Sequence, residues 1–101
     1  MFKNQRYATA GIQLELPLEL QLFLWNLIDN LSRTNKLDYL QVFELTAEKD
    51  DKGQPIQKIV HKQEQPLYKK TYQIVHTNST HAKIFVIDDE THSTMLLAQE
   101  Y

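Results

Sequence analysis

The feature that most constrains this sequence of 101 residues is one amphipathic segment that follows Pro17. From Leu18 to Arg33, apolar residues recur at intervals of three and four positions, the spacing that lines one side of an α-helix. Pro17 fits the first turn of such a helix, where its missing N–H is not needed. A helix with one apolar side has to bury that side against another element. The stripe consists of Leu20, Phe23, Leu24, Leu27, Ile28 and Leu31.

The rest of the chain has the pattern of β-strands joined by short connections. Only two glycines and three prolines interrupt it, which leaves little room for long irregular loops. Alternation of apolar and polar residues predicts a strand from Arg6 to Leu16 that ends at Pro17. Runs rich in β-branched and aromatic residues predict further strands. These cover Leu37–Leu45, Ile56–Lys62, Lys70–His76, Ala82–Asp88 and Ser93–Leu97.

These elements predict a single α+β domain over residues 1–101. Its sheet is expected to be mostly antiparallel, with about five or six strands and one long amphipathic helix packed on one face. The small polar residues of Thr77–Thr80 suit a turn that joins two strands as a hairpin. The segment Thr94–Tyr101 fits a strand or a short helix, so its structure stays open at this point.

Composition excludes several classes of function. The chain has no cysteine, so it cannot form a disulfide, bind metal through thiolates or use a thiol nucleophile. A net charge of −2 gives no overall attraction to nucleic acid or to an anionic membrane. No apolar run is longer than that of Leu22–Trp25, which is far shorter than the roughly 20 residues that span a bilayer. The amino terminus lacks the apolar run of a secretory signal. We therefore expect a soluble, cytoplasmic protein with no membrane partner.

Several blocks of the sequence carry a resemblance to a known family. In the same order along the chain, they resemble a short domain of unknown function from staphylococci and related Gram-positive bacteria, family 960 of the uncharacterised domains. The resemblance spans nearly the whole chain and implies an intact, single-domain bacterial protein. It implies no catalytic motif, ligand or partner. The blocks are Pro17–Asp29, Leu37–Leu45, Lys83–Asp89 and Ser93–Ala98.

The histidines are candidate metal ligands because imidazole binds zinc, nickel and copper. His61, His76, His81 and His92 all fall in the predicted sheet, and His76 and His81 would lie together at the base of one hairpin. None has the spacing of a known metal motif, so we predict surface histidines, no metal site and no cofactor.

A second candidate for chemistry is the turn that contains Asp88, Asp89 and His92, which follows an apolar strand. Two carboxylates at the end of a strand can hold Mg²⁺, which leaves a small metal-dependent hydrolase as an alternative. Adjacent aspartates are also ordinary turn residues. No serine has the setting of an acyl-transfer nucleophile. The sequence therefore favours a protein without catalytic residues.

A basic cluster makes weak binding of single-stranded nucleic acid another alternative, because lysines and tyrosines together offer charge and stacking. Acidic residues are distributed through the same half of the chain, and lysines also protect sheet edges, so we do not expect nucleic acid as a partner. The cluster consists of Lys58, Lys62, Lys69, Lys70 and Lys83, with Tyr68 and Tyr72 between them.

The outer side of the helix carries a second apolar stripe, formed by Leu18, Leu22 and Trp25. Either a terminal segment, Met1–Tyr7 or Met95–Tyr101, lies over this stripe, or a second copy or protein partner binds to it. We predict a protein-interaction or regulatory module whose interface contains these three residues.

Overall fold

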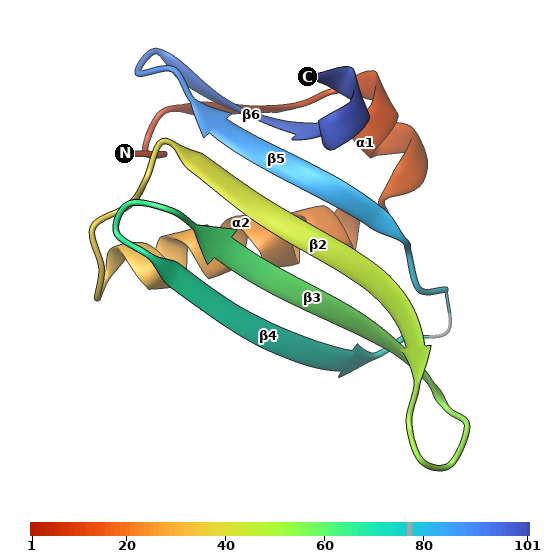
Figure 1. Cartoon of the computed structure of the whole chain (residues 1–101). Helices are drawn as coiled ribbons and strands as arrows, with labels where there is room; N and C mark the ends of the chain where they lie inside the picture. Colours follow the sequence, from red (N-terminus) through yellow and green to blue (C-terminus); the bar gives the residue numbers. More distant parts are fainter. Residues whose placement is uncertain (77) are drawn as a thin grey trace.

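The computed structural model describes residues 1–76 and 78–101 and has the predicted α+β architecture, with a six-stranded, mostly antiparallel sheet and one long helix (Figure 1). The elements follow the order β1 (Gln5–Ala8), α1 (Ala10–Glu15), α2 (Leu18–Ser32), β2 (Leu40–Lys49), β3 (Pro55–Gln63), β4 (Tyr68–Val75), β5 (Ala82–Asp88), β6 (His92–Leu97) and the 3₁₀ helix η1 (Ala98–Glu100). The last segment thus contains both candidates, a strand up to Leu97 and then one helical turn.

The strands are arranged in the order β1-β6-β5-β2-β3-β4. β2, β3 and β4 form an antiparallel meander, and the chain then crosses to the far side of β2, where β5 and β6 form a hairpin. β1 completes the sheet parallel to β6. β4 and β5 are therefore not neighbours, so the predicted hairpin between His76 and His81 is wrong. Its turn includes residue 77, which lies outside the described residues.

The predicted strand from Arg6 to Leu16 is wrong beyond Ala8, because α1 occupies its second half. The Thr9 hydroxyl accepts a hydrogen bond from the Ile12 N–H and caps this helix. Ile12 and Leu16, four positions apart, are buried, whereas Leu14 is exposed. Ile12 and Leu16 fit the spacing of a strand and also that of a helix. The capping residue Thr9 was the signal that favoured the helix.

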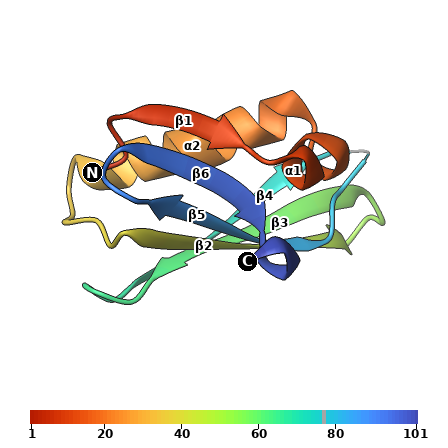
Figure 2. The same ribbon diagram turned by 90° about the horizontal axis from the view of Figure 1, so that it is seen from above.

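The core lies between α2 and one face of the sheet. Five residues of the predicted stripe are buried there, and Phe23 packs at the margin against Tyr72, with ring centroids 6.2 Å apart. Viewed from above, α1 and α2 lie on the same side of the sheet (Figure 2). Across the described residues, the opposite side of the sheet has neither of these helices over it, and we call it the open face. No described helix combines the length and apolarity that crossing a membrane requires.

Candidate functional site

The structure separates the three residues of the predicted outer stripe on α2. Leu18 and Leu22 are 67% and 54% exposed, but Trp25 is only 8% exposed. The guanidinium carbon of Arg6 lies 4.6 Å from the centroid of the Trp25 ring, a cation–π contact. Of the two alternatives, cover by the terminal segment Met1–Tyr7 therefore holds for Trp25, which does not share an exposed surface with the two leucines. β1 adds to the sheet beside β6, and from there Arg6 reaches over the indole.

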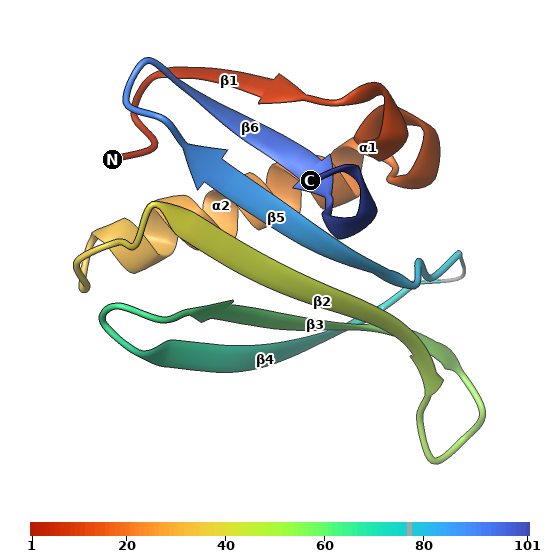
Figure 3. The same ribbon diagram turned by 45° about the horizontal axis from the view of Figure 1, so that its top comes forward.

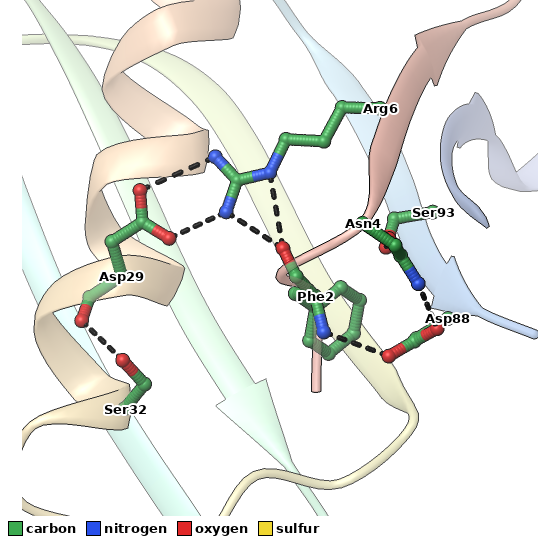
Figure 4. A network of polar contacts seen from close by, with 7 residues as sticks. All are labelled: Phe2, Asn4, Arg6, Asp29, Ser32, Asp88 and Ser93. Atoms are coloured by element: carbon green, nitrogen blue, oxygen red, sulfur yellow. Dashed lines mark hydrogen bonds and ion pairs between the residues drawn. The ribbon is translucent and has the colours of Figure 1, made fainter. Parts of the chain in front are cut away.

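A polar network holds this N-terminal segment in place (Figure 4). Arg6 donates to both carboxylate oxygens of Asp29 on α2 and to the carbonyl oxygen of Phe2. The Phe2 N–H donates to Asp88 Oδ2 at 2.7 Å, and the Asn4 amide donates to Asp88 Oδ1 at 2.9 Å. The Phe2 side chain is itself buried in the core. The segment before β1 is thus an integral part of the fold.

In the turn proposed for a metal-dependent hydrolase, the carboxylates of Asp88 and Asp89 accept hydrogen bonds that stabilise the fold. Asp88 accepts from Phe2, Asn4 and the Glu90 N–H, whereas Asp89 accepts from Thr91 and the His92 N–H. Burial alone raises the pKa of Asp88, but these hydrogen bonds outweigh it and hold that pKa below its ordinary value. Within residues 1–76 and 78–101, no three histidine, aspartate or glutamate side chains form a group that could hold a metal ion.

Asp88→Asn is expected to lower the free energy of unfolding by about 2 kcal/mol, because charge-assisted hydrogen bonds to the N-terminal segment are weakened. Amide hydrogen exchange of β1 should accelerate along with this loss. Asp89→Asn, in the exposed part of the same turn, is the matched control and should leave β1 protected. Equal exchange of β1 in both variants would contradict the anchoring role of Asp88.

His61 is fully buried, which corrects the expectation of a surface histidine. Its ring stacks on Phe43 at a centroid distance of 4.4 Å, and its Nε2 lies 2.7 Å from Gln41 Oε1. Gln41 in turn donates to Gln63, whose amide donates to the carbonyl oxygens of Lys36 and Pro66. Among the described residues, His61 Nδ1 has no hydrogen-bond partner. Burial lowers the pKa of His61 to about 4, so the ring is neutral at physiological pH.

This polar chain beneath the helix was not predicted from the sequence, although a signal for it existed. Gln57, His61 and Gln63 alternate with the same parity as the buried Ile59, so they point to the helix-covered face of β3.

The basic cluster is divided between the two faces of the sheet. By strand parity and register, Lys58, Lys62, Lys69 and Lys83 point to the open face, whereas Tyr68, Lys70 and Tyr72 point to the helix-covered side. On the open face, Lys62 Nζ lies 3.3 Å from Glu44 Oε2 and Lys58 Nζ lies 3.7 Å from Glu48 Oε2. The tyrosines thus do not share a face with most of the lysines, and two of those lysines have acidic partners.

The centre of the open face is apolar. In the sheet register, Val42 lies beside Phe85 and Phe85 beside Leu96, while the next row joins Leu40, Ile87, Thr94 and Tyr7. These neighbours form a surface that crosses four strands and is apolar except at Thr94, which lies between Ile87 and Tyr7. The predicted central strand contained the signal, because Leu37–Leu45 was too evenly apolar for one solvated face. We call this surface the apolar strip, and it consists of Tyr7, Leu40, Val42, Phe85, Ile87 and Leu96.

A hollow of about 310 Å³ adjoins the apolar strip and includes Leu40 and Val42 in its wall. It lies between the start of β2, the end of β3 and the turn into β4. Tyr39 and Leu67 are exposed at it, and its wall contains two lysines, Lys62 and Lys69, and two acidic residues, Asp38 and Glu64. Its size is at the lower end of small-ligand sites, which suits one inserted side chain.

Comparisons with known proteins agree with this fold and add no activity. A solved structure, the crystal structure of a protein of unknown function from Enterococcus faecalis, is 27% identical, with a TM-score of 0.79 over 97% of this chain and 91% of that chain. No curated protein matches. The family model described as staphylococcal protein of unknown function (DUF960) matches residues 5–100. The chain therefore belongs to this family of bacterial proteins of unknown function.

Proposed function

We propose that this cysteine-free chain acts in the cytoplasm as a protein-binding module, and that the apolar strip receives the partner. The observation that carries the proposal is the continuous apolar surface at the centre of a sheet face that α1 and α2 leave open (Figure 2). Tyr7 is exposed and the other five residues are half-buried, with the Tyr101 ring packed edge-on against Phe85 at a centroid distance of 5.7 Å. Contiguous apolar surface that still contacts solvent on a folded protein is typical of an interaction site. The adjoining hollow supports the same use, since interfaces commonly place an anchor side chain in a pocket.

The charges around the apolar strip favour a protein partner over nucleic acid. Glu44 and Glu48 already neutralise Lys62 and Lys58, and Lys83 lies over the Phe85 ring at 5.8 Å from its centroid. Binding to a phosphate backbone rewards unpaired positive charge. A partner with an apolar centre and a mixed polar rim fits this surface better.

The two exposed leucines of α2 form an alternative interaction surface. Leu18 and Leu22 are 67% and 54% exposed, so the interface predicted for them from the sequence stays a proposal. They are flanked by polar residues such as Glu19 and Asn26, so they offer a smaller apolar area than the strip. Photo-crosslinking from each side of the molecule therefore distinguishes the two surfaces.

A photo-crosslinking phenylalanine analogue placed at Phe85 in living cells is expected to form a covalent adduct with one partner protein. Leu22 is the matched control position because it is exposed on the opposite side of the molecule. Adding Val42→Glu beside Phe85 should abolish the adduct, since a carboxylate would then lie within the strip. Mass spectrometry of the purified adducts is the measurement.

Three results would contradict the proposal. The first is the absence of any protein adduct at Phe85, and the second is an adduct from Leu22 alone, which would assign binding to α2. The third is an adduct of the chain with itself at Phe85, which would make the strip a contact between copies.

A further inference from the structure

The two edge strands of the sheet, β1 and β4, differ in length. β1 is a short edge of four residues, whereas β4 is a free edge of eight residues (Figure 3). The segment Thr71–Val75 contains no charge, proline or glycine and is rich in β-branched and aromatic residues. Natural proteins usually protect long edges of this kind, because they bind further strands.

Backbone groups on β4 are available for such pairing. The His76 N–H donates to the Pro55 carbonyl oxygen at 3.3 Å, and hydrogen bonding alternates along an antiparallel pair. By this alternation, the backbone of Tyr72 and Ile74 points to β3, and that of Thr71 and Gln73 points away from the sheet. No hydrogen bond made within residues 1–76 and 78–101 across another strand reaches these outward groups.

We propose that a second copy of this chain pairs with β4, antiparallel and about a two-fold axis at Tyr72. In this register, Thr71 lies opposite Gln73 of the second copy, and Lys69 lies opposite its Val75. All of these residues have outward-facing backbone groups, so both strands satisfy the same ladder. The result is one sheet that continues through both copies.

The lysines of β4 favour this register. The two copies of Lys70 are separated by four residues along the strands, about 13 Å, which exceeds the Debye length of about 8 Å. A shift of two residues would place Thr71 opposite Thr71 and bring the two Lys70 side chains to about 7 Å along the strands. Lysine repulsion thus disfavours an axis closer to Lys70, and the contact of Lys69 with Val75 distinguishes the proposed register from one about Gln73.

Side chains on both faces of the edge are complementary in the same register. Val75 is 71% exposed, and the aliphatic stem of Lys69 from the second copy would cover it. The Tyr72 residues meet at the two-fold axis, in a position without mutual hydrogen bonds where paired side chains lie closest. Phe23 already packs edge-on against Tyr72, which restricts the ring in the single chain.

Sedimentation equilibrium of the full chain tests the pairing. We expect a reversible dimer whose dissociation constant rises roughly ten- to a hundredfold in Gln73→Pro, because the ladder loses two hydrogen bonds per dimer. The lost N–H faces outward, so the ladder between β3 and β4 is kept, which circular dichroism and melting can check. Gln73→Thr retains the N–H and is the matched control, with no change expected.

A charge pair then tests the register. Thr71→Glu with Gln73→Glu places like charges opposite each other and should weaken the dimer at least about tenfold. Thr71→Lys with Gln73→Glu places opposite charges there and should restore it. A chain that stays monomeric up to about 1 mM, a dimer insensitive to Gln73→Pro, or equal dissociation of both charge variants would overturn the proposal. Dissociation by Val42→Glu alone would assign the contact to the apolar strip.

Discussion

Trp25→Ala is expected to lower the free energy of unfolding by about 3 to 5 kcal/mol, a large fraction of the stability of a domain of this size. The reason is the buried position of the indole, which is 8% exposed between α2 and Arg6. Removal of the ring leaves a cavity between α2 and β1 that these two elements cannot fill. Urea denaturation followed by circular dichroism is the measurement, at a fixed protein concentration because a dimer's stability depends on it.

Leu22→Ala is the control for this prediction, because Leu22 lies on the same helix but is 54% exposed. Its effect should stay within roughly 0.5 kcal/mol, as for other surface substitutions. A Trp25→Ala protein that unfolds like the wild type but no longer binds its partner would contradict the structural role. That result would restore the sequence-based hypothesis that Trp25 belongs to an interface.

Lowering the pH from 6.5 to 4 is expected to reduce the free energy of unfolding by about 3 kcal/mol through His61 alone. Burial lowers the pKa of His61 from 6.5 to about 4, so the unfolded chain binds a proton in this range that the folded chain does not. Stability therefore rises with pH across this window and is lost toward acid. Equilibrium unfolding at a series of pH values measures the slope.

His61→Gln is the variant that isolates this effect, because its amide can still donate to Gln41 while nothing titrates. Its stability should depend less on pH between 6.5 and 4 than that of the wild type. Asp88 acts in a lower window, since its pKa is held below the ordinary 3.8 and its contribution disappears only as the pH falls further. Identical slopes for the wild type and His61→Gln between pH 4 and 6.5 would contradict the assignment.

Local pattern was sufficient to predict α2 and most strands. The stripe from Leu20 to Leu31 has the helical period alone, so it predicts α2 without an alternative. β5 has the predicted bounds Ala82–Asp88. The segment around Ile12 was ambiguous because Ile12 and Leu16 satisfy both the strand and the helix spacing. β5 pairs with β2 and not with β4. This pairing joins segments that are far apart in the sequence, and hydrophobic periodicity contains no information about it.

The candidate site could be predicted only in part, for a similar reason. A helical wheel shows that Leu18, Leu22 and Trp25 lie away from the core stripe, but it contains no information about Arg6, which covers Trp25 from another strand. The evenly apolar sequence of Leu37–Leu45 indicated the apolar strip. Its location on the open face followed only from the side on which α2 packs.

The parallel pairing of β1 with β6 sets an order in which the chain can complete its fold. Within residues 1–76 and 78–101, β6 is the one strand beside β1, and it follows the other strands in the sequence. During synthesis, α2 and the meander of β2, β3 and β4 can therefore form while the segment with Phe2 and Arg6 still has no strand to join. The contact of Arg6 with Trp25 is therefore expected to form only after β6 has emerged from the ribosome. Contacts of such long sequence separation are the slow ones in folding, so docking of β1 is expected to be the last step.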